Sequence, residues 1–168
     1  WLSYELSGEA RFRDEALARL PDFHARLDGR VEVETHDLGF LYSLSCLPAW
    51  RLLGNEDGRR IALKAATLLM ARYHEKAGII QAWGDLRDPA LRGRIIIDCA
   101  MNLPLLLWAS EETGDHYFRE AALSHLAAAN PNLLREDGSS YHTYYFDVET
   151  GAPLRGSTAQ GHSDSSCW

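Results

Sequence analysis

The chain has 168 residues, of which 46% are hydrophobic and 24% charged, and its formal net charge is −7 at pH 7. This is the length of one domain and the composition of an ordinary globular protein. The negative charge argues against a surface built for nucleic acid phosphates or anionic lipid, so we expect neither nucleic acid nor membrane as a partner. A negative net charge is still compatible with a local Arg/His site that binds a small anionic ligand.

The three cysteines are odd in number and widely spaced, with no CxxC motif or Cys/His ligand spacing. The simplest interpretation is a reducing compartment, which predicts a cytoplasmic protein, or a periplasmic one if a signal peptide has been removed. The longest apolar run, 103–109, contains a proline and is far too short to span a membrane.

Three stretches of the chain resemble one another and predict helical hairpins. Each has an aromatic-led helix end, a turn with glycine (Gly8, Gly54 or Gly114), and a second helix with alanines at its packing positions. Glycine suits the left-handed residue that ends a helix. Such repeats indicate an open solenoid or a closed toroid. Because the pattern is cut at both termini, we expect 1–168 to be part of a single longer domain. The stretches are 1–20, 50–73 and 108–129.

Two longer connections interrupt the helices. Residues 78–97 contain strand-like pieces, and residues 136–154 alternate like a β-hairpin around 149–151. Both connections precede a helix of the next hairpin, so we expect them to gather on one face of the scaffold. Loops on a rigid scaffold are where function tends to collect.

Asp37 and Asp98 hold equivalent places in successive repeats. Asp37 stands just before a predicted helix that runs to Leu53, and Asp98 stands just before one that runs to Trp108. Equivalent positions in stacked hairpins face the same mouth, so we expect both carboxylates in one pocket. A lone Asp before a helix is most simply an N-cap. The repeated pair, with His36 beside one acid, makes the cap-only interpretation less favoured.

Two neighbouring carboxylates can divide the work of general acid/base catalysis. A helix N-terminus lowers the pKa of a carboxyl group, whereas apolar neighbours or a second carboxylate raise it. One member of such a pair can then be ionised while the other is protonated. Asp98 follows an isoleucine triplet, whereas Asp37 follows His36.

Other polar side chains are weaker candidates. His142 lies among aromatic residues and is most simply a strand histidine bonded to the backbone. Gln160 and Trp168 lie in a Gly/Ser-rich stretch that is either a linker or a ligand-contacting loop. A metal site made from His36, Asp37, Asp98 and His142 has no supporting local motif such as HExxH, so we predict no metal. Surface or packing roles are expected for His24, His74, His116 and His125.

Four motifs in order resemble the unsaturated glucuronyl hydrolases, glycoside hydrolase family 88. They are HDLGF at 36–40, ID at 97–98 with MNLPLL at 101–106, R-x-DGS-x-x-H at 135–142, and QG at 160–161 with S-x-W at 166–168. The resemblance spans essentially the whole chain. The unsaturated rhamnogalacturonyl hydrolases, family 105, share the fold and the paired aspartates, but the His-Asp-x-Gly-Phe motif fits them less well.

The resemblance implies an all-α (α/α)6 barrel, a toroid of six helical hairpins. The chain would hold about three of them, with a small β-hairpin. It also implies a hydrolase for unsaturated uronyl oligosaccharides produced by polysaccharide lyases. Such an enzyme hydrates the C4=C5 double bond of the non-reducing-end unsaturated glucuronic acid, and the remaining saccharide is released. No metal or organic cofactor is implied. The family's habit of working on imported disaccharides agrees with a cytoplasmic location.

By the same resemblance, Asp98 donates a proton to C4 and activates the water that adds at C5. It would be kept partly protonated by its surroundings, and it could also be a helix cap. Asp37 would hold the sugar and tune Asp98. His36, His142 and Gln160 would contact the uronate or its hydroxyls, and Trp168 would offer a stacking face.

Two other functional classes stay open at this point. One is a helical-repeat binding module without catalysis, and the other is an ordinary inverting glycosidase on the same toroid. The saccharide behind the uronate is also open, with fragments of hyaluronan, chondroitin, heparin, gellan or xanthan as candidates. The oligomeric state is not predicted.

Overall fold

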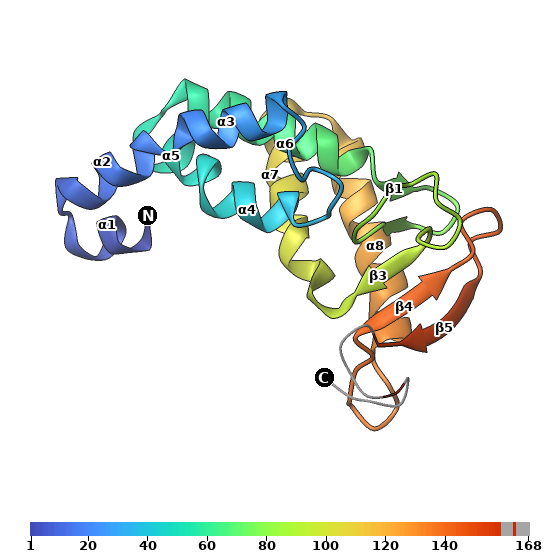
Figure 1. Cartoon of the computed structure of the whole chain (residues 1–168). Coiled ribbons are helices and arrows are strands. Elements are labelled where there is room, and N and C mark those ends of the chain that lie inside the picture. The colour runs from blue at the N-terminus through green and yellow to red at the C-terminus, as the bar shows by residue number, and fades with distance from the viewer. Residues whose placement is uncertain (159–162, 164–168) are drawn as a thin grey trace.

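The computed structural model describes residues 1–158 and 163, in which helical hairpins lie beside a small antiparallel sheet (Figure 1). The helices are α1 (Leu2–Ser7), α2 (Ala10–Ala18), α3 (Leu20–Asp28), α4 (Leu38–Leu44), α5 (Cys46–Leu53), α6 (Glu56–Met70), the 3₁₀ helix η1 (Ile97–Asn102), α7 (Leu103–Thr113) and α8 (His116–Leu133). The strands are β1 (Tyr73–His74), β2 (Ile79–Ile80), β3 (Arg94–Ile96), β4 (Thr143–Phe146) and β5 (Pro153–Ser157).

The three predicted turn glycines each end a helix in the left-handed conformation. Gly8 follows α1 with φ 69°, Gly54 follows α5 with φ 64°, and Gly114 follows α7 with φ 76°. A residue with a Cβ adopts this conformation only at a cost, so glycine at these places specifies where one helix ends and the next begins. The helix–glycine–helix prediction is confirmed for all three hairpins, α1–α2, α5–α6 and α7–α8.

Prolines correct the predicted helices that follow the two aspartates. The helix expected to run from Asp37 to Leu53 is broken at Ser45, because Pro48 lacks the N–H that would bond to residue 44 and its ring would clash there. The helix expected directly after Asp98 begins only at Leu103, with Pro104 in its first turn, and 97–102 form the 3₁₀ helix η1 instead.

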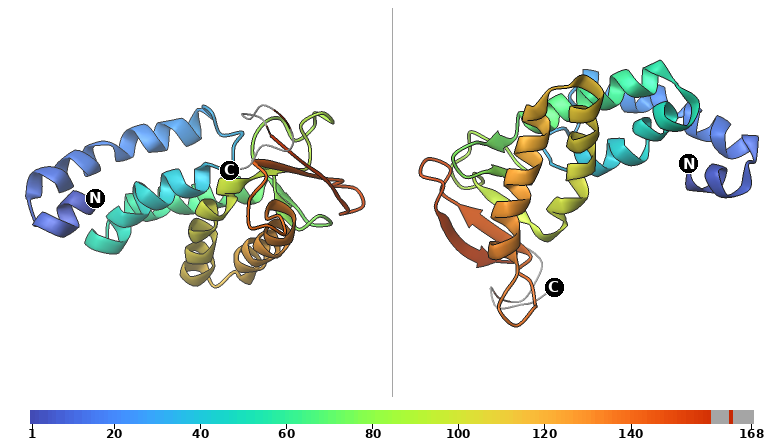
Figure 2. Two further views of the ribbon diagram at one scale, coloured as in Figure 1. Left: turned by 90° about the horizontal axis from the view of Figure 1, so that it is seen from below. Right: turned by 180° about the vertical axis from the view of Figure 1, so that it is seen from behind.

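The main core lies between α4, α5, α6 and α7. Helix α6 presents the small side chains of Ala62, Ala65 and Ala66, all fully buried, which lets its neighbours approach closely. Leucines of α7 pack against the same core. The views of Figure 2 show these helices side by side, with α8 between them and the sheet. Repeated alanines therefore make the hairpins stack.

The connections form more β-structure than the single predicted β-hairpin. Strands β4 and β5 pair around the predicted turn, and β3 from the first long connection adds to β4, so the sheet order is β3-β4-β5. A separate antiparallel pair joins β1 to β2. Ile95 and Phe146 from the larger sheet pack with Leu133 of α8 in a second core. The two connections thus meet on one side of the hairpins (Figure 1).

The N-terminal end of α4 touches the end of η1 at one glycine. A Cβ on Gly39 would lie 2.4 Å from the Cα, Cβ and O of Asn102, closer than real atoms approach. Beside this contact, the backbone N–H of Phe40 donates to Oδ1 of Asn102 at 3.0 Å. Gly39 is needed here for close approach and not for an unusual backbone conformation.

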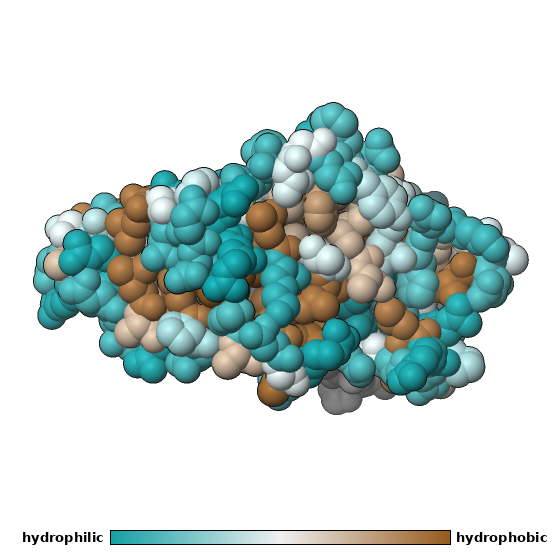
Figure 3. Space-filling view, turned by 90° about the horizontal axis from the view of Figure 1, so that it is seen from above, coloured by the Kyte–Doolittle hydropathy of each residue, from teal (hydrophilic) through white to brown (hydrophobic). Residues whose placement is uncertain are grey.

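Apolar side chains are also exposed on this scaffold. Figure 3 shows apolar patches among polar residues on one face of the molecule. A groove of about 490 Å³ lies between α4, α5 and α7, and both Leu44 and Met101 at its edge are more than half exposed. The remaining apolar residues that line it are Phe40, Leu47, Pro104, Leu107 and Trp108.

The Gly39→Ala substitution tests the contact between α4 and η1. Alanine normally favours a helix over glycine by up to about 1 kcal/mol. We nevertheless expect a loss of about 1–3 kcal/mol in the free energy of unfolding, because the added methyl overpacks the contact. Denaturant unfolding of the chain measures this change. Leu44→Ala, at an exposed position of the same helix, is the control and should change stability by about 0.5 kcal/mol or less. Equal stability of Gly39→Ala and the unsubstituted chain would contradict the close contact.

Candidate active site

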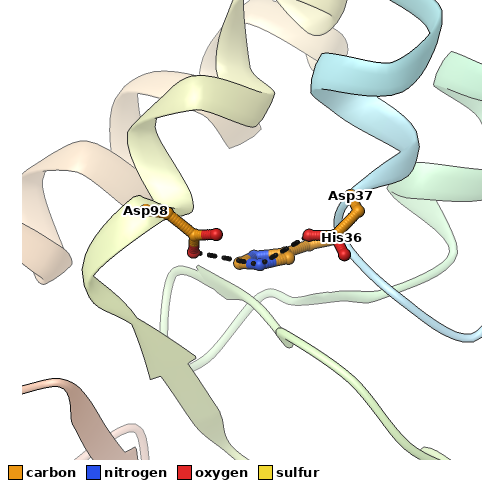
Figure 4. Close-up of side chains that lie close together, drawn as sticks. All are labelled: His36, Asp37 and Asp98. Atoms are coloured by element: carbon orange, nitrogen blue, oxygen red, sulfur yellow. Dashed lines mark ion pairs between the residues drawn. The ribbon is translucent and has the colours of Figure 1, made fainter.

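The imidazole of His36 lies between the carboxylates of Asp37 and Asp98 (Figure 4). Its Nε2 is 3.3 Å from Oδ1 of Asp37 and 3.4 Å from Oδ1 of Asp98. His36 is buried, whereas the two carboxylate side chains are 39% and 38% exposed. The structure therefore brings together the two acids that the repeat pattern placed in one pocket, and it adds a buried base between them.

Backbone bonds to a neighbouring segment hold His36 in place. The N–H of His36 donates to the carbonyl of Ala82 at 2.6 Å, and Thr35 forms an antiparallel bridge with Trp83. The N–H of Asp37 donates to the hydroxyl of Thr35 at 3.2 Å. The connection after α6, through Ala82 and Trp83, thus packs along one side of the site.

The three-stranded sheet places Asp98 and His142. Asp98 follows β3 in the first turn of η1, and His142 directly precedes β4. The N–H of Ile97 donates to the carbonyl of His142 at 3.0 Å, which extends the β3–β4 ladder to these two residues. Pairing of strands that are distant in the sequence therefore sets the position of one acid relative to one histidine.

Neither aspartate caps a helix, so the cap interpretation is wrong for both. Asp37 precedes α4 with helical backbone angles (φ −58°, ψ −15°), and its side chain accepts no capping hydrogen bond. At η1 the cap position belongs to Ile96, again without a side-chain bond. Both carboxylates are directed at His36 instead (Figure 4).

The structure keeps Asp98 ionised, which corrects the expectation of a partly protonated acid. Contact with the His36 imidazole lowers the pKa of Asp98. Burial opposes this effect, and the nearby His142 adds a small lowering contribution. The apolar residues around Asp98 were expected to dominate. The histidine outweighs them, because a polar imidazole close to a carboxyl group favours its charged form.

His142 is a buried imidazole rather than a simple strand histidine. Its Nδ1 lies 2.8 Å from the hydroxyl of Thr143. Burial lowers the pKa of His142, and the negative charge of Asp98 only partly opposes this shift. A neutral imidazole beside an ionised carboxylate can serve a ligand as donor or acceptor.

Several buried polar atoms at the site have unused hydrogen-bonding capacity. Within the described residues, Nε2 of His36, Oδ1 of Asp98 and Nδ2 of Asn102 have no hydrogen-bond partner, because the contacts of Nε2 with the carboxylates lack hydrogen-bond geometry. An unsatisfied buried polar atom costs about 1–3 kcal/mol. Such a cost is typical of sites built to receive a ligand. Sequence reasoning quoted Asn102 within a motif but assigned it no role.

Two buried arginines, Arg72 and Arg94, lie near the connection through Ala82, and nothing in the sequence indicated them. Nε of Arg72 donates to the carbonyl of Gln81 at 2.9 Å, and burial lowers the pKa of Arg72 to about 10, so it stays charged at neutral pH. The guanidinium of Arg94 stacks on Trp83, 4.0 Å from the ring centre. Their charges favour an anionic ligand in this half of the molecule. Single arginines in a sequence carry no signal that they will be buried.

Among the other histidines, His125 has a structural role. His125, for which a surface or packing role was expected, is buried on α8, and its Nδ1 accepts the N–H of Ile80 at 2.8 Å. Burial lowers the pKa of His125 to about 3, so it packs as a neutral group. Gln160 and Trp168, the two remaining candidates, lie outside the residues that the structure describes.

Among the described residues, the same three side chains could hold a metal ion. Donor atoms of His36, Asp37 and Asp98 lie within 4.8 Å of one another. One imidazole and two carboxylates are ligands that Zn²⁺ accepts. They are equally the groups that transfer a proton between a carboxyl group and a bound substrate.

Comparisons with known proteins cover the whole chain. It is 49% identical over 168 residues to the unsaturated glucuronyl hydrolase of Bacillus sp. strain GL1, and 48% identical over 168 residues to the unsaturated chondroitin disaccharide hydrolase of Streptococcus pneumoniae. It covers 45% and 42% of these proteins, so it spans less than half their length. No protein-family model matches the chain.

Solved structures agree with these relatives. The crystal structure of the Bacillus sp. GL1 enzyme matches 100% of this chain and 45% of its own with a TM-score of 0.95. A mutant of the Streptococcus agalactiae unsaturated glucuronyl hydrolase, complexed with dGlcA-GalNAc6S, matches with a TM-score of 0.75 at 38% identity. That match covers 100% of this chain and 39% of the mutant enzyme's.

The stacked helical hairpins, matched over the whole chain by these solved structures, are part of an α/α toroid. The named relatives, which match the entire chain in sequence and in structure, indicate a particular family with this fold. Over its whole length the chain is similar to part of the unsaturated glucuronyl hydrolases, glycoside hydrolase family 88. The predicted resemblance to this family and the predicted partial toroid are both confirmed, and the named relatives are bacterial.

Stability against acid tests the contact between His36 and Asp98. The pKa of Asp98 is lower in the folded chain than the value of about 3.9 in an unfolded one. Its contribution to the free energy of unfolding is therefore complete above about pH 4 and is lost as the pH falls through the folded pKa. We expect the stability difference between the unsubstituted chain and Asp98→Asn to shrink below pH 4, as measured by denaturant unfolding from pH 7 to pH 3. A difference that stays constant over this range would contradict the lowered pKa.

Proposed function

We propose that residues 1–168 are part of a single longer (α/α)6 domain that hydrolyses unsaturated uronyl oligosaccharides produced by polysaccharide lyases. The reaction is hydration of the C4=C5 double bond of the non-reducing-end unsaturated glucuronic acid, followed by release of the remaining saccharide. The observation that carries the proposal is the convergence of Asp37 and Asp98 on the buried imidazole of His36. The relatives' names support the same substrate class.

The longer domain is supported by the apolar groove between α4, α5 and α7. Its exposed Leu44 and Met101 are of the kind that further helices would cover. The relatives, more than twice as long as this chain, have the residues to supply those helices. We infer that helices of the remaining hairpins pack over this groove and cover its apolar side chains.

In the proposed reaction Asp98 changes its protonation state when the substrate binds. The uronate carboxylate adds a negative charge and displaces water, and both effects raise the pKa of a neighbouring carboxyl group. Asp98, ionised in the free site, then takes up a proton and can deliver it to C4. The positive charge that develops at C5 is shared with the ring oxygen. The carboxylate of Asp98 next accepts a proton from the water that adds at C5, so the catalyst returns to its protonated form.

The hydrated sugar is a hemiketal, which opens and releases the saccharide that was linked at C1. Asp37 holds the sugar beside Asp98, and His36 keeps the two acids together. His142 and Gln160 contact the uronate or its hydroxyls, and Trp168 stacks on the sugar. The buried, neutral state of His142 supports its part as a hydrogen-bonding residue.

Replacing Asp98 tests the proposal directly. In the full-length protein, Asp98→Asn should lower kcat by on the order of 10²–10⁴, because it removes the general acid and base. The measurement is the loss of near-ultraviolet absorbance of the conjugated C=C–carboxylate group in an unsaturated chondroitin disaccharide. Asp57→Asn, the same change at an exposed site of α6, is the control and should keep full activity. Full activity of Asp98→Asn would refute the assignment.

Chelation tests the proposed absence of a metal from the reaction. Proton transfer by carboxylates needs no cation, so excess EDTA followed by gel filtration should leave the rate unchanged. The protein incubated with added Zn²⁺ serves as the comparison, because His36, Asp37 and Asp98 are the residues that would bind it. A rate that collapses with EDTA and returns with a divalent cation would overturn the metal-free mechanism.

The same assay separates the remaining alternatives. Cleavage of saturated glycosides would indicate an ordinary inverting glycosidase, and tight binding without turnover would indicate a binding module. A family 105-like preference for unsaturated rhamnogalacturonides is not favoured by the named relatives. Comparing this chain with the full-length protein shows whether the toroid must be closed. The glycan is assigned by a panel of sulfated and unsulfated disaccharides.

We also propose a cytoplasmic location, supported by the free, buried thiols of Cys46 and Cys99. In the part of the chain that the structure describes, no helix has the length and apolar character to cross a membrane.

A further inference from the structure

The first turn of α4 is capped from another repeat. In an ordinary helix start, the side chain of the N-cap residue accepts the N–H of the second or third helical residue. Asp37 stands at the N-cap of α4, yet the N–H of the third residue, Phe40, donates to Oδ1 of Asn102 at 3.0 Å. Asn102 is the last residue of η1, 62 positions further along the chain.

Asn102 therefore occupies the place that the carboxylate of Asp37 would normally fill. The N–H of the second helical residue, Gly39, is already bonded to the carbonyl of His36 at 2.9 Å. The N–H of Phe40 is thus the donor for which Asp37 and Asn102 compete. Because Asn102 holds it, the Asp37 carboxylate is directed away from its own helix and toward His36 (Figure 4).

Packing alone does not account for an asparagine at this position. Asn102 is 1% exposed, and its Nδ2 has no hydrogen-bond partner within the described residues. A leucine, whose side chain branches in the same way, would bring no buried, unsatisfied donor, which costs about 1–3 kcal/mol. What leucine cannot supply is the oxygen that accepts the Phe40 N–H.

We propose that Asn102 is a positioning residue of the site. By capping α4 it keeps the Asp37 carboxylate off its own helix and beside Asp98. Without that oxygen, the Asp37 side chain turns back to the Phe40 N–H and leaves the site. The effect on catalysis rests on the proposed function, whereas the competition for the Phe40 N–H does not.

A double-mutant cycle on thermal unfolding tests the competition, with no need for activity. In the unsubstituted chain Asp37 is not a cap, whereas after Asn102→Ala it becomes one. Asp37→Ala should therefore lower Tm by about 2–4 °C more in the Asn102→Ala background than in the unsubstituted background. Equal shifts of Tm in the two backgrounds would overturn the proposal. Where Asn102→Ala does not fold, Asn102→Ser, which shortens the side chain, replaces it in the cycle.

Kinetics of the full-length protein test the catalytic consequence. Asn102→Ala should lower kcat by about 10–100-fold, because a displaced group loses its alignment. In a protein that already carries Asp37→Ala, the same change should lower kcat by less than about threefold, since the carboxylate that it would displace is absent. A purely structural role of Asn102 predicts the same fold-change in both backgrounds, and that result would overturn the proposal.

Asn102→Asp, which keeps an acceptor oxygen, is the conservative variant and should retain more of kcat than Asn102→Ala. Absence of any turnover by the unsubstituted full-length protein would count against the proposed function and leave the unfolding cycle to decide whether Asn102 competes with Asp37.

Discussion

The contact between Gly39 and Asn102 determines the geometry of the site. Two helix ends from different repeats meet there with no space for a single methyl group, and a hydrogen bond to Phe40 reinforces the contact. Asp37 directly precedes α4, and Asp98 lies in the first turn of η1, four residues before Asn102. Because the helices are rigid and their cores are close-packed, one close approach is enough to fix the distance between the two carboxylates.

The electrostatics of the free site follow from a buried base between two acids. His36 is almost inaccessible to water and touches both carboxylates, and its imidazole lowers the pKa of Asp98. An anionic ligand bound at such a site would raise the pKa of a neighbouring carboxyl group and favour its protonated form. In the proposed reaction, the proton needed for catalysis is taken up only when the uronate is in place. The proposal thus couples substrate binding to the acid strength of Asp98 through charge.

The helical hairpins form the scaffold of the structure, and the connections between them form the site. Alanine-rich helix faces and left-handed glycines build a regular stack, which is what a repeat requires. The connections break the repeat and contribute the polar groups. Pairing of β3 with β4 carries Asp98 and His142 to adjacent places, and the segment through Ala82 holds His36. A toroid with plain connections would lack these groups.

Local chemistry in the sequence was sufficient to determine part of this protein. Gly8, Gly54 and Gly114 end helices because only glycine adopts the left-handed conformation easily, and that requirement is visible without the fold. The equivalence of Asp37 and Asp98 also follows from position in the repeat. Both features can be read from the order of residues along the chain.

Only the tertiary structure decided the rest. The pairing of β3 with β4, the direction of the Asp98 pKa and the capping of α4 by Asn102 all join residues far apart in sequence. Asp98 illustrates the reason, since its neighbours in the chain are apolar and suggest a raised pKa, yet a histidine from the preceding repeat lowers it. Contacts and charges act through space, and a sequence shows only their order along the chain.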